Sequence, residues 1–174
     1  MVRNHVTEIL LPFRRSLLTI VLRIAIVAAI PALLTGMYAA LAAGAYTILI
    51  VDTIAYLTLI PAYLYVRRRY RTAAALMIAA ILMVGITLLF SVGTEGASML
   101  WLLTSVVLAM LLLGERATVI VGAITTIAVI ITGALLVSDS LRWDVPLYGW
   151  IAIAGSYIAI AVFLTLATRF LLNR

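Results

Sequence analysis

The chain has 174 residues, of which 67% are apolar and only 10% are charged, and its formal net charge is +6. An average soluble domain is roughly a quarter charged, so a water-soluble globule of this size could not cover its surface. The composition therefore excludes soluble enzymes and disordered chains and indicates an integral membrane protein. Because a bilayer-spanning helix uses roughly 20 apolar residues, the chain has room for about six spans.

Several chemistries are excluded by residue types that the chain lacks. It contains no cysteine and no lysine, and all 12 basic residues are arginine. Disulfides, thiolate nucleophiles, retinal Schiff bases and lysine-based phosphate loops therefore have no residue to carry them. The single histidine, His5, lies in the N-terminal segment, so haem ligation by paired histidines is excluded, and no HExxH or GxSxG motif is present. We expect no enzymatic activity, no metal site and no cofactor.

The apolar runs predict an all-α, polytopic membrane protein with six transmembrane helices. Runs of this length without alternation are typical of helices and not of barrel strands. A cytoplasmic interfacial segment at residues 1–16 precedes a membrane domain at residues 17–174, and short connections make successive helices antiparallel neighbours. The six predicted spans cover residues 17–43, 46–66, 72–90, 97–113, 117–137 and 145–172.

The arginines predict the orientation of these spans. With both termini on one side, that side collects ten arginines and the opposite side keeps only Arg142. Because cytoplasmic loops are enriched in arginine, we place both termini in the cytoplasm. The run from Arg67 to Arg71 joins two spans, so it is a topology signal and not a nucleic-acid site. The residues assigned to topology and to the membrane interfaces are Arg67, Arg68, Arg69, Arg71, Arg116, Trp101, Trp143 and Trp150.

Asp52 is the most informative single position, because it lies inside the second predicted span. It is about six residues, or 9 Å of helix rise, from the outer end of that span. Thr53 and Tyr56 share its helix face, so the three residues form a polar patch that should point into the bundle. A carboxylate in lipid is costly and usually faces a partner or a cavity. The patch is either a ligand or proton site in the outer half, or a structural carboxylate held by hydrogen bonds.

Two further candidate ligand contacts are predicted in the outer half. Glu95 stands between Gly93 and Gly96 in a loop at the mouth of the bundle, where it either contacts a ligand or is solvated. Tyr157 lies in the sixth predicted span.

Small residues at fourfold spacing predict close packing of helices. They occur on the first and sixth predicted spans, as Gly36, Ala40 and Gly44 and as Gly155 and Ala159. Whether this packing lies within one chain or between chains is left open.

One pattern is more specific than hydropathy. A glycine-rich outer loop at residues 93–96 precedes a span that opens with Trp101 and leucines, and this span ends in a leucine run and the turn Gly114-Glu115-Arg116. With the basic turn from Arg67 to Arg71, this arrangement over residues 10–174 resembles the multi-helix membrane input domains of bacterial sensor histidine kinases and diguanylate cyclases. The resemblance implies a bacterial inner-membrane protein.

The resemblance implies a sensory input module that binds a small or apolar ligand or senses the state of the membrane. In the resembling proteins the last membrane helix continues into a coiled coil that drives a cytoplasmic output domain. We therefore expect a homodimer and an output domain or partner protein, with the lipid bilayer as solvent. The present chain is either a membrane domain excised from such a protein or works through a separate partner. The alternative is the substrate-binding membrane subunit of an energy-coupling-factor vitamin transporter.

Overall fold

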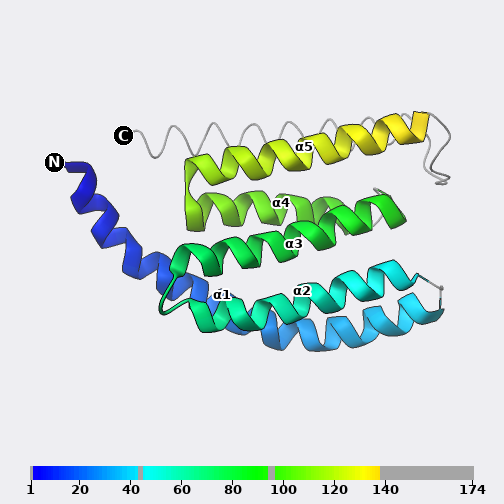
Figure 1. Ribbon diagram of the computed structural model, residues 1–174, viewed down its shortest axis with the longest axis horizontal. Helices are drawn as coiled ribbons and strands as arrows, with labels where there is room; N and C mark the ends of the chain where they lie inside the picture. The colour runs from blue at the N-terminus through cyan, green and yellow to red at the C-terminus, as the bar shows by residue number, and fades with distance from the viewer. Residues whose placement is uncertain (1, 43–44, 94–96, 138–174) are drawn as a thin grey trace. The chain divides into compact units, whose positions relative to one another are not determined.

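The structure is a computed structural model that describes residues 2–42, 45–93 and 97–137. Within these ranges the regular structure is entirely helical, as predicted (Figure 1). The sixth predicted span, at residues 145–172, lies outside the described residues, so the total of six spans stays a prediction. The helices are α1 (Val2–Ala42), α2 (Tyr46–Tyr65), α3 (Tyr70–Val92), α4 (Ser98–Leu108), the π-helix η1 (Ala109–Leu113) and α5 (Glu115–Val137).

The described helices lie where five of the spans were predicted. α2 ends one residue before the predicted boundary, and α3 extends two residues beyond it at each end. Four helices, α1, α2, α3 and α5, are long and apolar enough to cross a membrane. The fourth predicted span is a shorter apolar helix over Ser98–Leu113, built from α4 and η1.

Helix α1 continues through the segment predicted to lie at the membrane surface. It runs from Val2 to Ala42 and includes both Pro12 and Pro31. Proline lacks a backbone N–H and normally interrupts a helix, but membrane helices tolerate it where side chains satisfy the freed groups. The carbonyl that Pro31 leaves without its usual donor is that of Val27, four residues earlier. The Thr35 hydroxyl donates to a different group, the Pro31 carbonyl, at 2.9 Å. Residues 2–16 are therefore helical, while their position at the membrane surface stays a prediction.

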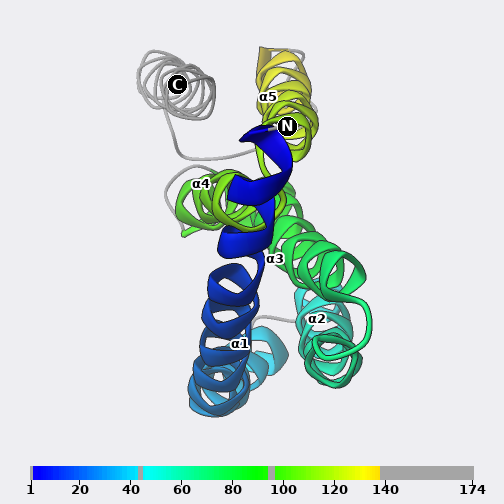
Figure 2. The ribbon, with the colours of Figure 1, turned by 90° about the vertical axis from the view of Figure 1, so that its left-hand side faces the viewer.

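The chain divides into two compact units, Met1–Ala80 and Ile81–Arg174, and the boundary falls inside α3. In the first unit α1 and α2 pack along each other (Figures 1 and 2). Leu18 and Leu22 of α1 are fully buried. The buried residues of α2 and its C-cap recur at spacings of three and four, which aligns them on one helix face: Ala55, Leu59, Ala62 and Val66.

The core of the second unit joins α3, α4 and α5. It is formed by Leu89, Leu102, Ala128 and Val129, with partly buried leucine, isoleucine and methionine side chains around it. Gly85 lets α3 approach α4 closely: a Cβ atom at Gly85 would lie 2.9 Å from the Leu102 Cδ2 atom and 3.1 Å from its backbone nitrogen.

Buried hydroxyls recur every seven residues along the second unit. Thr118, Thr125 and Thr132 on α5 have no exposed surface, and neither have Ser98 and Ser105 on α4. The threonine hydroxyls donate to backbone carbonyls three or four residues earlier, at 2.8–3.0 Å. Because each hydroxyl is satisfied by its own backbone, these small side chains can be packed without a polar partner on another helix.

The turn between η1 and α5 depends on a glycine. The Gly114 N–H donates to the Ala109 carbonyl at 2.9 Å, a bond to the fifth residue back that is typical of a π-helix. Gly114 itself has φ 87° and ψ −168°, a conformation that is essentially restricted to glycine. The chain therefore reverses at this residue and enters α5 without an intervening loop.

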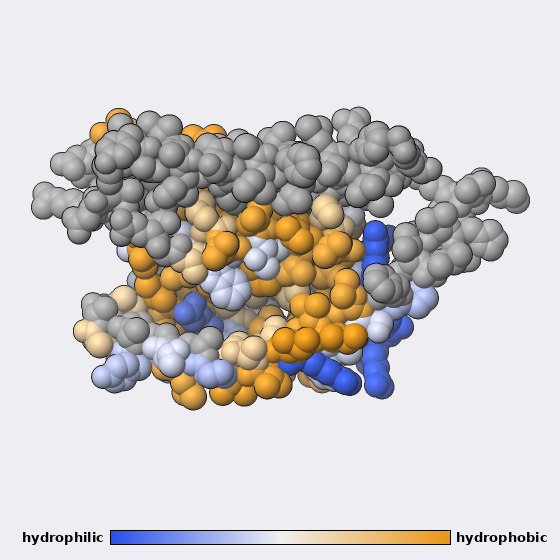
Figure 3. All heavy atoms as spheres, turned by 180° about the vertical axis from the view of Figure 1, so that it is seen from behind, coloured by the Kyte–Doolittle hydropathy of each residue, from blue (hydrophilic) through white to orange (hydrophobic). Residues whose placement is uncertain are grey.

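The surface of the helices is unsuited to water. On α1, Val27 and Leu34 expose 69% and 63% of their area, and Leu64 on α2 exposes 69%. The described side chains visible in Figure 3 are largely hydrophobic. Exposed apolar area on this scale is favourable only in lipid, so the fold is that of a membrane protein.

Substituting alanine at Gly85 is expected to destabilise the second unit. Overpacking of this kind costs about 1–3 kcal/mol, more than the gain of about 1 kcal/mol in helix propensity. The free energy of unfolding, measured by SDS titration in mixed micelles, should fall for Gly85→Ala. In the double variant with Leu102→Ala, the loss should be smaller than the sum of the two single losses, because truncation removes the closest clash. Additive losses would contradict the close approach of Gly85 to Leu102.

Candidate functional site

The predicted polar patch lies in the first half of α2. Asp52, Thr53 and Tyr56 are all half-buried. Asp52 follows the first residue of the helix by six positions, about 9 Å of helix rise. Asp52 and Tyr56 are four residues apart and so share one face of the helix.

The three polar side chains of this patch differ in what they contact. The Thr53 hydroxyl donates to the Leu49 carbonyl at 2.8 Å, so its proton is already used within the helix. In contrast, neither Asp52 nor Tyr56 forms a hydrogen bond or an ion pair within the part of the chain that the structure describes. A carboxylate inside a span therefore stands without a donor from the described residues, which is the arrangement that favours an external ligand or proton.

The other predicted site residues are divided between the described and the remaining parts of the chain. Gly36 and Ala40 belong to α1. Trp101 lies in the first turn of α4 with 40% of its surface exposed, and Arg116 is exposed at the start of α5. Both exposures are compatible with a membrane interface, and these roles stay predictions. The residues outside the described ranges are Glu95, Tyr157, Trp143, Trp150, Gly44, Gly155 and Ala159.

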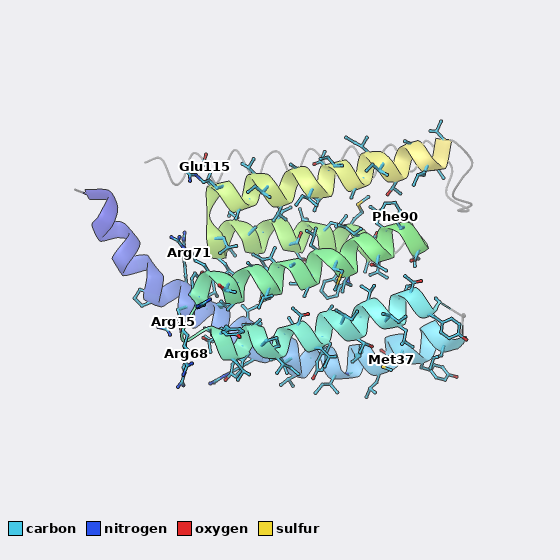
Figure 4. All side chains as sticks on the ribbon, viewed as in Figure 1. Arg15, Met37, Arg68, Arg71, Phe90 and Glu115 are labelled. Carbon is cyan, nitrogen blue, oxygen red and sulfur yellow. The ribbon has the colours of Figure 1, made fainter. Side chains whose placement is uncertain are left out.

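Arg15 and the arginines of the turn after α2 lie at one end of the first unit. The guanidinium of Arg15 on α1 donates to the backbone carbonyl of Arg67, in the turn after α2. Figure 4 shows Arg15, Arg68 and Arg71 close to this turn. The turn is closed by the N–H groups of Arg68 and Arg69, which donate to the Tyr65 carbonyl at 3.0 and 2.8 Å. Arg15 and the arginines of the turn thus lie at one end of this unit, while the orientation of the chain in the membrane stays a prediction.

A pocket opens at the same end. Its volume is about 460 Å³, and it is lined by Tyr65, Arg68, Arg69 and Thr72. The residues that line it carry two guanidinium groups and two hydroxyl groups, all of which can donate hydrogen bonds. Arg68, Arg69 and Thr72 are exposed, so the pocket is accessible from outside the protein.

One residue that the sequence places inside the first span has a specific partner. Arg23 on α1 donates from Nε to the Tyr63 hydroxyl at 3.0 Å, and its guanidinium carbon lies 5.8 Å from the centre of the Tyr63 ring. This distance is within the range of a cation–π interaction. Arg23 therefore links α1 and α2 near their arginine-rich end.

The sequence predicted a topological role for the arginine turn but did not predict the pocket beside it. The run of arginines from Arg67 was visible, but Tyr65 and Thr72 carry no motif of their own. The signal that could have found them is their position: each lies within four residues of both Arg68 and Arg69, on either side of a tight turn. Across residues 2–42, 45–93 and 97–137, no group of three or more metal-ligating side chains is present.

One comparison with known proteins gives a match. The model of the MASE11 family matches residues 12–174. No curated protein and no solved structure matches the chain.

The link between Arg23 and Tyr63 predicts a measurable coupling. In a double-mutant cycle of Arg23→Gln and Tyr63→Phe, the coupling in the free energy of unfolding is expected to be about 0.5–1 kcal/mol, because exposed pairs of this type are worth little more. Unfolding by SDS in mixed micelles provides the measurement. As a control, Arg71→Gln should be additive with Tyr63→Phe. If the Arg23 cycle gave no coupling free energy, the contact between Arg23 and Tyr63 would not stabilise the packing of α1 against α2.

Proposed function

We propose, because the chain belongs to the MASE11 family of membrane-associated sensor domains, that it is a sensory input module. The single observation that carries this proposal is the family match, which spans residues 12–174 and so nearly the whole chain. The module binds a small or apolar ligand, or responds to the state of the membrane, and passes the change to a cytoplasmic output domain. The family and the apolar helices agree on a protein that works within a bilayer.

The stimulus acts, in this proposal, near Asp52 in the outer half. A ligand can shift a conformational equilibrium only through contacts that differ between two states. The half-buried carboxylate of Asp52 and the hydroxyl of Tyr56 can make such contacts, because no described residue occupies them. A hydrogen-bond donor on a ligand, or a proton, would satisfy the carboxylate and favour the packing in which it is bound. Glu95 and Tyr157 are proposed to complete the ligand contacts.

The output is proposed to follow the arrangement of the resembling kinases and cyclases. Six spans would bring both termini to the cytoplasmic side of a bacterial inner membrane. The sixth span would then shift or rotate in a homodimer and move the output domain or partner protein. In this proposal the protein has no catalytic activity, metal or cofactor of its own. Nothing in the described residues favours the transporter-subunit alternative, whereas membership of a sensor-domain family favours sensing.

The proposal predicts that Asp52 controls the output. The chain would be joined in frame after Arg174 to a diguanylate cyclase domain, and cyclic di-GMP would be measured in cells with and without benzyl alcohol, a small apolar compound that also fluidises membranes. Asp52→Asn keeps the size of the side chain but removes its charge. It is expected to change the response at least twofold, because the differential contact is lost.

Two controls distinguish an error in the assignment of Asp52 from an error in the proposed sensory function. Thr58→Val on the same helix should leave the response unchanged, because the Thr58 hydroxyl donates to the Ile54 carbonyl at 2.8 Å. The cyclase domain carried by a single unrelated span should not respond to benzyl alcohol. If Asp52→Asn and wild type respond alike, the assignment of Asp52 is wrong. If the single-span fusion responds as the wild type does, the sensory function of this membrane domain is wrong.

A further inference from the structure

We propose that the pocket formed by Tyr65, Arg68, Arg69 and Thr72 binds the phosphate headgroup of an anionic phospholipid. The proposal is independent of the sensory function. It rests on the geometry and charge of the arginine-rich end of the first unit, where the end of α2 and the start of α3 surround a pocket of about 460 Å³. This volume falls within the usual range of small-molecule sites, roughly 300–1,000 Å³.

The positive charge of this end is uncompensated by nearby described carboxylates. Asp52 is the only acidic residue of the first unit whose side chain the structure describes. It precedes Tyr65 by 13 residues, which is about 20 Å along the helix. The side chains of Arg68 and Arg69 make no hydrogen bond or ion pair with any described residue. Among the described residues, no group competes with an anion for these donors.

The chemistry of the pocket suits a phosphodiester. Guanidinium groups donate in a planar fork that matches two phosphate oxygens, and such charge-assisted hydrogen bonds are stronger than neutral ones. The Thr72 hydroxyl adds a donor that does not depend on net charge. Arg15 is held differently, since its guanidinium donates to the Arg67 carbonyl. It adds positive charge beside the turn and ties α1 to the site.

The surroundings of the pocket favour a lipid over a soluble phosphate. Leu57, Ile60 and Leu64 share one face of α2 and are all exposed, with Leu64 directly before the pocket residue Tyr65. On α3 the exposed residues Thr72, Ala75 and Ala79 likewise share a face. These faces lead from the pocket along the apolar helices, where acyl chains joined to a bound headgroup would lie. A free phosphate would make no use of them.

The test measures ligand binding by isothermal titration calorimetry, with the full chain in neutral maltoside micelles. The probes are dioctanoyl phosphatidylglycerol, dioctanoyl phosphatidylcholine, glycerophosphoglycerol and inorganic phosphate. Arg68→Gln with Arg69→Gln is expected to weaken binding of the phosphatidylglycerol at least tenfold, because charge-assisted hydrogen bonds are lost. The control, Arg71→Gln with Arg116→Gln, removes the same charge from exposed residues outside the pocket and should weaken binding less than threefold.

A second variant keeps the test valid if the double variant fails to fold. Thr72→Val preserves charge and shape and should weaken phosphatidylglycerol binding several-fold, which attraction by charge alone would not produce. Equal losses in the two arginine pairs, or no loss in Thr72→Val, would overturn the pocket. Equal affinity for phosphatidylcholine would overturn recognition of an anionic headgroup. If glycerophosphoglycerol or inorganic phosphate binds as tightly as the lipid, the occupant is a soluble phosphate and the lipid proposal is wrong.

Discussion

The structure depends on the requirement that polar groups in a bilayer find their hydrogen bonds inside the protein, because no water is available there. The helices meet this requirement for the backbone, and many of the threonine hydroxyls meet it through their own helix. Thr19, Thr53, Thr58 and Thr104 each donate to the carbonyl four residues earlier, as do Thr118 and Thr132 in the second unit. Against this background, the half-buried carboxylate of Asp52 has no donor among the described residues, and ionisable groups inside spans are commonly functional.

The same requirement governs how the helices pack. Apolar surface gives helices little reason to associate in lipid, so close contact of small side chains has to supply the attraction. Gly85 brings α3 against Leu102, and the buried threonines of α5 alternate with residues such as Gly122 and Gly133. Burying these hydroxyls therefore costs little free energy, because each one donates to a carbonyl of its own helix. A helix interface of this kind is built from glycine and threonine, which a hydropathy scale does not rank as strongly hydrophobic.

Much of the fold could be predicted from the sequence because the bilayer imposes a length on each apolar run. The ends of α2 and α3 fall within two residues of the predictions for this reason. The π-helix at Ala109–Leu113 could not be predicted, since hydropathy carries no information on helical pitch. The patch of Asp52, Thr53 and Tyr56 was predicted from spacing, but not that Thr53 donates to its own backbone. The pocket at Thr72 depends on how a turn folds, and the arginines alone indicated only an orientation. The sevenfold spacing of the buried hydroxyls was present in the sequence, but it resembles chance until burial is known.

The exclusive use of arginine has a consequence for the end of the first unit at which Arg15 and Arg68 lie. Guanidinium groups stay protonated throughout the biological pH range, whereas amines and imidazoles can lose their charge in suitable surroundings. Lysine acetylation, which removes the charge of an amine, also has no target in the chain. The affinity of the proposed headgroup site would therefore be adjusted from the other side of the interaction, through ionic strength or through the lipids that the cell supplies.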